Sequence, residues 1–512
     1  MLVVLPPSPQ RVRELQEREA AYYWSGRAED ALRSLGLISV TTAVERRVPE
    51  AGSVLVLRGT EITEEEWGEL KGRPLLFEAP VHASVERLLA VEVESQTTDW
   101  LDLVDFPRQG RANLIESPRP KRTVQPANGL GHGLPWNSGP VSVYDPGLPA
   151  VPGTRARTAE GSIVSLVQRR GPHTVLTVPL LDLVVQWLTY PPIEDDGHAG
   201  FEGVSSPLQA MRALLSCLLE GLSEDTPEVT CDPLPPGFRA AITLRHDYDR
   251  PISGSSCADL LAMYRKHGIV ASFGFLPYEL PVEQIVALQR DGHEVQVHSN
   301  ARSVGELQAH QRALAALTGS PPTGMTVHGG PSGPGFLGDR HFKWAHACGM
   351  EYAETFSPRA RQVVPVVSIE DESVYTMPLV VPPEHYSLDG STRAGDHRGE
   401  ALNKKLPQAL GRSEPVILMN HPDIHRDALG DLLDGLDLTG VWRVSTAGLT
   451  RFAAATRRDA IVTTDGPEVG VNIVRPLSVD ATYRVRARGS EDRALVISAG
   501  DTRGHVRLEE VA

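Results

Sequence analysis

Histidine and aspartate side chains gather at the ends of four short apolar segments in the second half of this 512-residue chain. The segments read LRHDYDRP, EVQVHS, MTVHGGP and VILMNHPDIH, and the residues concerned are Arg245, His246, Asp247, Asp249, His298, His328, His421, Asp423 and His425. Each segment has the length and composition of a buried strand. Because the carboxyl ends of parallel strands meet at one edge of a sheet, we expect one pocket to hold these side chains.

Imidazole nitrogens and carboxylate oxygens that converge in this way are typical ligands of divalent zinc, iron or cobalt. An ion with one open position makes water a nucleophile near neutral pH. The reaction then needs only a carboxylate to accept the proton of the water and an acid to protonate the leaving group. The residues therefore predict metal-assisted hydrolysis. The structural alternative is that Asp247 and Asp249 are turn residues that pair with Arg245 and Arg250, and that His298 is a core histidine.

Alternating strand and helix patterns supply the elements that must position these residues. Predicted helices over 257–267 and 282–290 end at Gly268 and just before Gly292, where glycine can adopt the left-handed conformation of a helix end. The expected strands are 241–245, 270–275, 294–298, 325–328, 351–355, 375–380, 416–420 and 442–445. This alternation predicts either a (β/α) barrel or a doubly wound sheet.

Taken in order, the four motifs resemble those of the polysaccharide deacetylase family, also called carbohydrate esterase family four or the NodB homology domain. The resemblance covers residues 236–459. It implies a distorted, seven-stranded (β/α) barrel that removes acyl groups from N-acetylated or O-acetylated sugars. It also implies one divalent metal ion as cofactor, with zinc first and iron, cobalt or nickel as the alternatives.

The resemblance assigns roles to individual residues of this chain. Asp249, two positions before Pro251, matches the metal-binding aspartate of the family, and Asp247 is the nearest match to its catalytic base. His298 matches a metal-binding histidine. His421 matches the histidine that protonates the leaving group.

Two departures from the family pattern concern the metal site and the substrate. Arg302 stands where the second metal-binding histidine belongs, and a guanidinium cannot bind a metal because it stays protonated. His328 is our first candidate for the missing ligand, since it lies at the next strand end. VHGGPSGPG replaces the usual arginine-proline motif, and its glycines would let substrate approach the backbone. The residues expected to contact substrate are Arg245, Arg302, Gly329, Gly330, Asp423 and His425.

The flanking segments predict two accessory domains. Residues 1–230 alternate strands and helices, contain Pro/Gly-rich loops over 106–161, and include VLVLRGTEITEEEWGELK. That stretch resembles the flavodoxin-like α/β fold of class I glutamine amidotransferases. No cysteine precedes Cys217, so we expect no glutaminase activity. Residues 460–512 show the period-two alternation of antiparallel strands and predict a small β-rich domain that serves as a structural cover.

Composition excludes several classes of protein. Fifty basic against 65 acidic side chains give a net charge of −15, which disfavours nucleic acid as a partner. The most apolar stretch, 175–190, is too short for a membrane span, and the first residues lack the pattern of an export signal, so we expect a cytoplasmic location. The four cysteines form no CxxC pair and are expected to be buried thiols.

The leading hypothesis is a metal-dependent hydrolase that removes an acyl group, first of all an N-acetyl group, from a carbohydrate or glycoconjugate. One alternative is a catalytically degenerate deacetylase-like protein that binds glycans or acts as a scaffold, which the Arg302 substitution favours. The other is an amidase that acts on a small intracellular metabolite. A homo-oligomer is compatible with each hypothesis.

Overall fold

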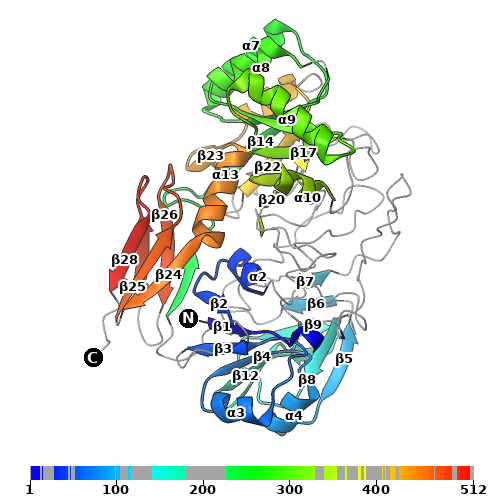
Figure 1. The fold of residues 1–512 in the computed structure, drawn as a ribbon, viewed down its shortest axis with the longest axis vertical. Helices are drawn as coiled ribbons and strands as arrows, with labels where there is room; N and C mark the ends of the chain where they lie inside the picture. Colours follow the sequence, from blue (N-terminus) through cyan, green and yellow to red (C-terminus); the bar gives the residue numbers. More distant parts are fainter. Residues whose placement is uncertain are drawn as a thin grey trace.

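The computed structural model describes residues 2–11, 14, 28–43, 46–47, 52–98, 100–103, 113–116, 141–158, 160–179, 227–278, 280–328, 340–354, 364–365, 379–381, 386–387, 406–407, 410, 415–422, 426–465, 467–486 and 493–507. They form a six-stranded sheet near the N-terminus, a ten-stranded sheet in the second half of the chain, and two three-stranded sheets near the C-terminus. Figure 1 shows these parts at the bottom, top and left of the molecule.

Parallel strands make up the body of the ten-stranded sheet. In spatial order they are β20 (Leu379–Val381), β18 (Tyr352–Glu354), β17 (Gly324–Val327), β16 (Glu294–Ser299), β15 (Ser272–Phe275), β14 (Ala240–Tyr248) and β22 (Pro415–Asn420). Three shorter strands complete the sheet: β19 (Val364–Pro365), β21 (Tyr386–Ser387) and β23 (Val441–Arg443).

The predicted α/β class with a parallel sheet is confirmed, and each strand expected between residues 241 and 445 overlaps an observed one. In the part of the chain that the structure describes, β19 and β21 are the ends of the sheet and do not pair with each other. The sheet is therefore a curved half-barrel there. Closure into a barrel of seven strands stays a prediction.

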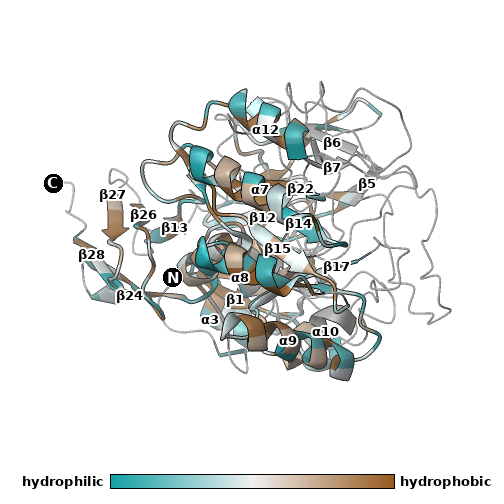
Figure 2. Cartoon of the chain, turned by 90° about the horizontal axis from the view of Figure 1, so that it is seen from above, coloured by the Kyte–Doolittle hydropathy of each residue, from teal (hydrophilic) through white to brown (hydrophobic). Residues whose placement is uncertain are grey.

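Helices cover one face of this sheet. Figure 2 shows α12, α7, α8, α9 and α10 following one another in an arc outside β22, β14, β15 and β17. Their bounds are α7 (Gly254–His267), α8 (Val282–Arg290), α9 (Val304–Thr318), α10 (Arg340–Ala347) and α12 (Arg426–Asp434). Helix α7 begins at the side-chain cap of Ser253 and ends at Gly268, whose φ of 60° is the left-handed conformation expected from the sequence.

Alternation along β14 decides which side chains face the helices. Ile242 and Leu244 share a hydrophobic core with Leu260 of α7, so even-numbered positions point outward. Ala241 belongs to a different core, which includes Ile417 of β22. Odd-numbered positions therefore point to the inner side of the curved sheet. Arg245 and Asp247 share this inner side.

Helix α13 (Thr446–Ala453) packs on the inner side of the sheet, at the amino ends of the sheet strands. It continues into the π-helical turn η2 (Ala454–Arg458). The backbone N–H of Thr446 donates to the Ser272 hydroxyl at 2.8 Å, and that of Ala447 donates to the Glu294 carboxylate at 2.9 Å. The Tyr352 hydroxyl donates to the same carboxylate at 2.6 Å. This network leaves the carboxyl ends of the strands as the edge where a site can open.

The N-terminal sheet has the spatial order β11-β12-β4-β3-β1-β2, with β11 antiparallel and the rest parallel. Its elements are β1 (Leu2–Leu5), α2 (Ala28–Ser34), β2 (Val40–Thr42), β3 (Ser53–Val56), α3 (Glu64–Leu70), β4 (Leu75–Glu78), α4 (Ala83–Leu89), β11 (Val167–Arg170) and β12 (His173–Leu176). Helix α3 begins with a capping box, in which Thr63 and Glu66 exchange hydrogen bonds.

Two smaller antiparallel sheets lie beside the N-terminal sheet in sequence, β10-β9-β6-β7 and β5-β8. Their strands are β5 (Glu94–Thr98), β6 (Trp100–Leu103), β7 (Asn113–Glu116), β8 (Val141–Asp145), β9 (Arg155–Thr158) and β10 (Ile163–Ser165). The apolar pattern of residues 162–168 predicts one strand, and this prediction is wrong, because the chain changes sheets at the buried Leu166 between β10 and β11. The sequence also predicts helices over 11–35 and 208–222, and most of the first and all of the second lie outside the described residues.

The C-terminal strands form two antiparallel sheets, β24-β25-β28 and β13-β26-β27. They are β13 (Glu228–Cys231), β24 (Ala460–Asp465), β25 (Glu468–Ile473), β26 (Ala481–Arg486), β27 (Arg493–Ile497) and β28 (Arg503–Arg507). Strand β13 precedes the deacetylase-like segment in sequence but pairs with β26, Cys231 opposite Tyr483. The Tyr483 ring is fully buried and offers no stacking surface to a sugar. The boundaries 1–230, 236–459 and 460–512 stay a prediction.

Across the residues described above, no helix combines the length and apolar character that crossing a membrane requires. Cys231 and Cys257 are buried free thiols and Cys348 is a partly buried one. Cys217 lies outside the described residues.

Candidate metal centre

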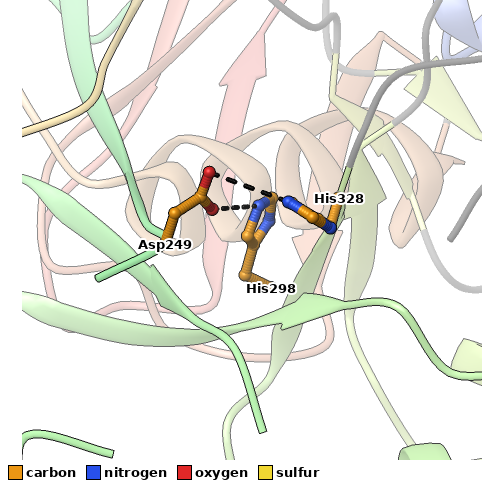
Figure 3. Close-up of side chains that lie close together, drawn as sticks. All are labelled: Asp249, His298 and His328. Carbon is orange, nitrogen blue, oxygen red and sulfur yellow. Dashed lines mark ion pairs between the residues drawn. The ribbon is translucent and has the colours of Figure 1, made fainter. Parts of the chain in front are cut away.

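Three ligand side chains meet at the carboxyl edge of the half-barrel (Figure 3). Asp249 is the first residue after β14, His298 is the last but one residue of β16, and His328 is the first residue after β17. One ligand atom from each lies within 4.8 Å of the other two. The backbone holds this arrangement, because the His328 N–H extends the sheet by donating to the Ser299 carbonyl at 2.8 Å.

The distances within this group suit a metal ion better than direct hydrogen bonds. His298 Nε2 lies 3.3 Å from Asp249 Oδ1, and His328 Nε2 lies 3.7 Å from Asp249 Oδ2. Charge-assisted hydrogen bonds are typically about 2.7–2.9 Å long. A tetrahedral ion with bonds of about 2.1 Å would instead separate its ligand atoms by about 3.4 Å. The buried Oδ1 of Asp249 accepts no hydrogen bond from any described residue. The donor set therefore fits zinc or a similar divalent ion.

His298 is oriented from behind by Thr326 of the neighbouring strand. Its Nδ1 lies 2.6 Å from the Thr326 hydroxyl, and both side chains are buried. With the Nδ1 proton donated to Thr326, Nε2 keeps its lone pair and faces Asp249. Gly274 of β15 makes room for this ring, since a Cβ there would lie 3.2 Å from both His298 Cβ and Thr326 Oγ1.

The histidines determine the charge of the cluster. Burial alone would raise the pKa of the Asp249 carboxyl, but His298, His328 and His421 together hold that pKa far below its usual range. Contact with Asp249 raises the pKa of His328, although burial opposes the shift. Asp249 is therefore a carboxylate at any ordinary pH, which is the form that binds metal.

His421 approaches the same carboxylate from a different strand. It is the first residue after β22, and its Nε2 lies 3.4 Å from Asp249 Oδ2. It is not one of the three residues whose ligand atoms all lie within 4.8 Å of one another. Its side chain is 22 % exposed, so a group entering from solvent can reach it. This placement suits a proton donor beside the ligand set.

Asp247 lies beneath the ligands as half of a buried ion pair. Its Oδ2 is 3.0 Å from Arg245 Nη2, and the two side chains are 8 % and 4 % exposed. Its Oδ1 is 3.5 Å from His298 Nδ1 and accepts no hydrogen bond from a described residue. One oxygen of Asp247 is thus fixed by a cation and the other is available to accept a proton.

The remaining sequence-predicted residues divide between outer positions and positions that the structure leaves undescribed. His246 points away from the pocket and stacks on Phe273, with ring centroids 4.7 Å apart, while its Nε2 contacts the Tyr264 hydroxyl. Arg302 is exposed on the loop before α9, where its backbone N–H donates to Glu306. Gly329, Gly330, Asp423 and His425 lie outside the described residues, and their assignment to substrate contact stays a prediction.

Sequence reasoning missed Thr326 and Gly274 as supports of His298. The period-two alternation contained the signal for both. Gly274 pairs with Gln296 and Thr326 pairs with His298, so their inner-face positions follow once the register is known. The same alternation places Arg245 beside Asp247, and the assignment of Arg245 to substrate contact stays a prediction.

Several solved structures that resemble this chain are described as polysaccharide deacetylases or related carbohydrate esterases. A Mycobacterium smegmatis protein assigned to the polysaccharide deacetylases is 15 % identical, with a TM-score of 0.35 over 43 % of this chain and 92 % of its own. A polysaccharide deacetylase from Bacillus cereus is 15 % identical, with a TM-score of 0.27 over 40 % of this chain and 91 % of its own.

A chitin deacetylase from Colletotrichum lindemuthianum is also 15 % identical, with a TM-score of 0.28 over 42 % of this chain and 88 % of its own. No family model matches the sequence, and no curated protein matches it. These solved structures bear the name of the family that the motifs resemble. Because identity is low, the chemistry proposed below rests on the residues of the site and not on these structures.

Proposed function

We propose that this protein is a metal-dependent hydrolase that removes an acyl group, first of all N-acetyl, from a carbohydrate or glycoconjugate. The observation that carries the proposal is the convergence of Asp249, His298 and His328, with Asp247 and His421 beside them. The sugar as substrate comes from the resemblance of the four motifs. The amide bond fits a site that offers both a base and an acid.

Asp249, His298 and His328 would hold the ion, and His328 would supply the nitrogen that Arg302 cannot. A divalent ion in this position, zinc in the first instance, polarises an acyl carbonyl and makes water a nucleophile near neutral pH. Thr326 holds the lone pair of His298 toward the ion. The Arg302 substitution therefore leaves a complete set of three protein ligands.

Asp247 acts as the general base in this proposal. Its free Oδ1 accepts the proton of the attacking water, while Arg245 holds Oδ2 and keeps the carboxylate from rotating. We propose this positioning role for Arg245 because its side chain is almost completely buried. A carboxylate held by a buried cation loses little orientational freedom on binding substrate.

His421 acts as the general acid. Its Nε2 lies 3.4 Å from Asp249 Oδ2 and its side chain is partly exposed to solvent, so its protonated form can donate to the nitrogen of the departing amine. The amine then leaves as the free amino sugar and the acyl group leaves as a carboxylate. Asp423 and His425, which follow in the chain, are proposed to orient His421 and the substrate.

The experiment is acetate release from N-acetylated chito-oligosaccharides by the full chain loaded with zinc. Asp247→Asn and His421→Asn should each lower kcat by about a hundredfold or more, because each removes a proton-transfer group. His505→Asn is the matched control, since His505 lies on the C-terminal strand β28 and is 52 % exposed. Equal acetate release by the control and both site variants would refute the proposal. Metal-independent sugar binding without acetate release would favour the degenerate scaffold.

A further inference from the structure

Three loops after adjacent strands of the half-barrel carry side chains that the proposed reaction does not use. Arg250 follows β14, Tyr278 follows β15, and Asn300 and Arg302 follow β16. These strands are parallel neighbours, so their loops leave the sheet at one edge. Arg250 adjoins Asp249 in the chain, and Asn300 is two residues from His298. The loops therefore border the mouth of the candidate metal centre.

An exposed aromatic ring occupies the middle loop. Tyr278 is 52 % exposed, which is unusual for a large apolar side chain in this protein. Its hydroxyl accepts a hydrogen bond from Asn300 Nδ2 at 3.4 Å, which joins the second and third loops. A ring fixed in this way offers a flat surface against which the apolar face of a sugar can pack.

Arg250 and Arg302, on the loops to either side of this one, are exposed, and among the described residues neither guanidinium forms an ion pair or a hydrogen bond. Glu306 faces the third loop, but its carboxylate accepts the backbone N–H of Arg302. Some exposed arginines of the chain have carboxylate partners, as Arg265 has Asp291 and Arg484 has Asp232. In a protein of net charge −15, two arginines at one mouth with no carboxylate partner among the described residues create a local positive field.

Guanidinium groups bind carboxylate and phosphate through paired hydrogen bonds. We propose that Arg250, Tyr278, Asn300 and Arg302, here named the cationic rim, bind a sugar that carries an anionic group beside its acyl group. This inference rests on the proposed function and adds the chemical class of its substrate. The anion is a carboxylate or a phosphate, which share this chemistry.

The test compares the affinity of three monosaccharides for the zinc-loaded full chain by isothermal titration calorimetry. N-acetylmuramic acid carries a carboxylate, N-acetylglucosamine 6-phosphate carries a phosphate, and N-acetylglucosamine carries neither. At least one anionic sugar should bind about tenfold or more tightly than the neutral one. In the double variant Arg250→Gln/Arg302→Gln this ratio should fall about tenfold, and higher salt should reduce it in the wild type.

Arg290→Gln is the control. Arg290 is the exposed last residue of α8, which returns the chain to the amino end of β16, so one charge of the same kind is lost at the opposite edge of the sheet. The control should keep the wild-type ratio. Equal affinity for all three sugars in the wild type, or an unchanged ratio in the double variant, would overturn the inference.

Acetate release, measured in parallel, separates this inference from the proposed function. An anionic preference that depends on Arg250 and Arg302, without acetate release from any sugar, supports the cationic rim and refutes the hydrolase. Acetate release from all three sugars at one rate, unaffected by the double variant, supports the hydrolase and overturns the cationic rim.

Discussion

Replacement of Arg245 by methionine should destabilise the protein far more than loss of a surface ion pair would. Methionine fills much of the same space but leaves the Asp247 carboxylate buried without its cation. Because the two side chains are only 4 % and 8 % exposed and their charged atoms lie 3.0 Å apart, solvent screens the pair poorly. Breaking such a pair from one side costs about 3 kcal/mol of unfolding free energy, compared with under about 1 kcal/mol for an exposed pair.

A double-mutant cycle isolates the pair from the other contacts of each residue. Asp247→Asn alone should cost about 2 kcal/mol, because it leaves Arg245 as the buried charge. The double variant Arg245→Met/Asp247→Asn should cost at least about 1 kcal/mol less than the sum of the single variants, since it leaves neither charge unpaired.

These losses of unfolding free energy can be measured in urea titrations. Hydrogen exchange of peptides from residues 240–250 is the readout, because it reports unfolding where the pair lies. A local probe is needed because a chain of this size need not unfold in one step. If the cost of the double variant equals the sum of the two single costs, the ion pair has no energetic coupling. The positioning role of Arg245 would then be wrong.

Three further perturbations test the packing around the site and the burial of its neighbours. Gly274→Ala places a Cβ 3.2 Å from the Cβ of His298. We expect about tenfold weaker zinc binding in a metal titration and a loss of about 1–2 kcal/mol of unfolding free energy. Unchanged zinc affinity would contradict the role of Gly274. Gly324→Ala places a Cβ 1.8 Å from the Tyr352 ring, which cannot be accommodated, and thermal unfolding should show a loss of more than about 3 kcal/mol or no folded protein. Burial lowers the pKa of His246 to about 3 in the folded protein. As the pH falls below 6.5, His246 therefore takes up a proton in the unfolded chain before it does so in the folded one. The folded state loses stability between pH 6.5 and 3. His246→Gln should remove about 2 kcal/mol of that loss between pH 7 and 5 in urea titrations, and an equal pH dependence in the variant and the wild type would contradict this.

The positions of the candidate metal ligands and of His421 could be predicted because the sequence pattern marks the ends of the strands. Asp249, His328 and His421 are each the first residue after a strand, and His298 is the last but one residue of its own. An apolar run followed by a polar residue marks such a position without any knowledge of the rest of the fold. The convergence then follows from the parallel direction of the strands alone.

The directions of side chains were harder to predict than their positions. Arg245 and His246 are consecutive, yet one lies under the metal centre and the other among Phe273 and the helices. Alternation separates them only when the inner face of the strand is known, and that depends on the curvature of the whole sheet. The pair with Asp247 therefore required the structure.

Non-local pairing limited what the sequence could predict about the organisation of the sheets. The chain changes sheets at Leu166 within the apolar run IVSLV, where no glycine or proline marks the break. Strand β13 pairs with β26 although about half of the chain lies between them, and no local pattern carries that information. A period-two pattern predicts a strand but not its partner.

The central claim is that Asp249, His298 and His328 bind one divalent ion, and metal content measures it most directly. The full chain, purified without chelator and given zinc, should contain one equivalent by elemental analysis. Asp249→Ala, His298→Ala and His328→Ala should each lose it, because a site with two protein ligands binds zinc weakly. His505→Ala, which removes an exposed imidazole outside the site, should keep the full equivalent. A full equivalent in His328→Ala, or none in the wild type, would contradict the account.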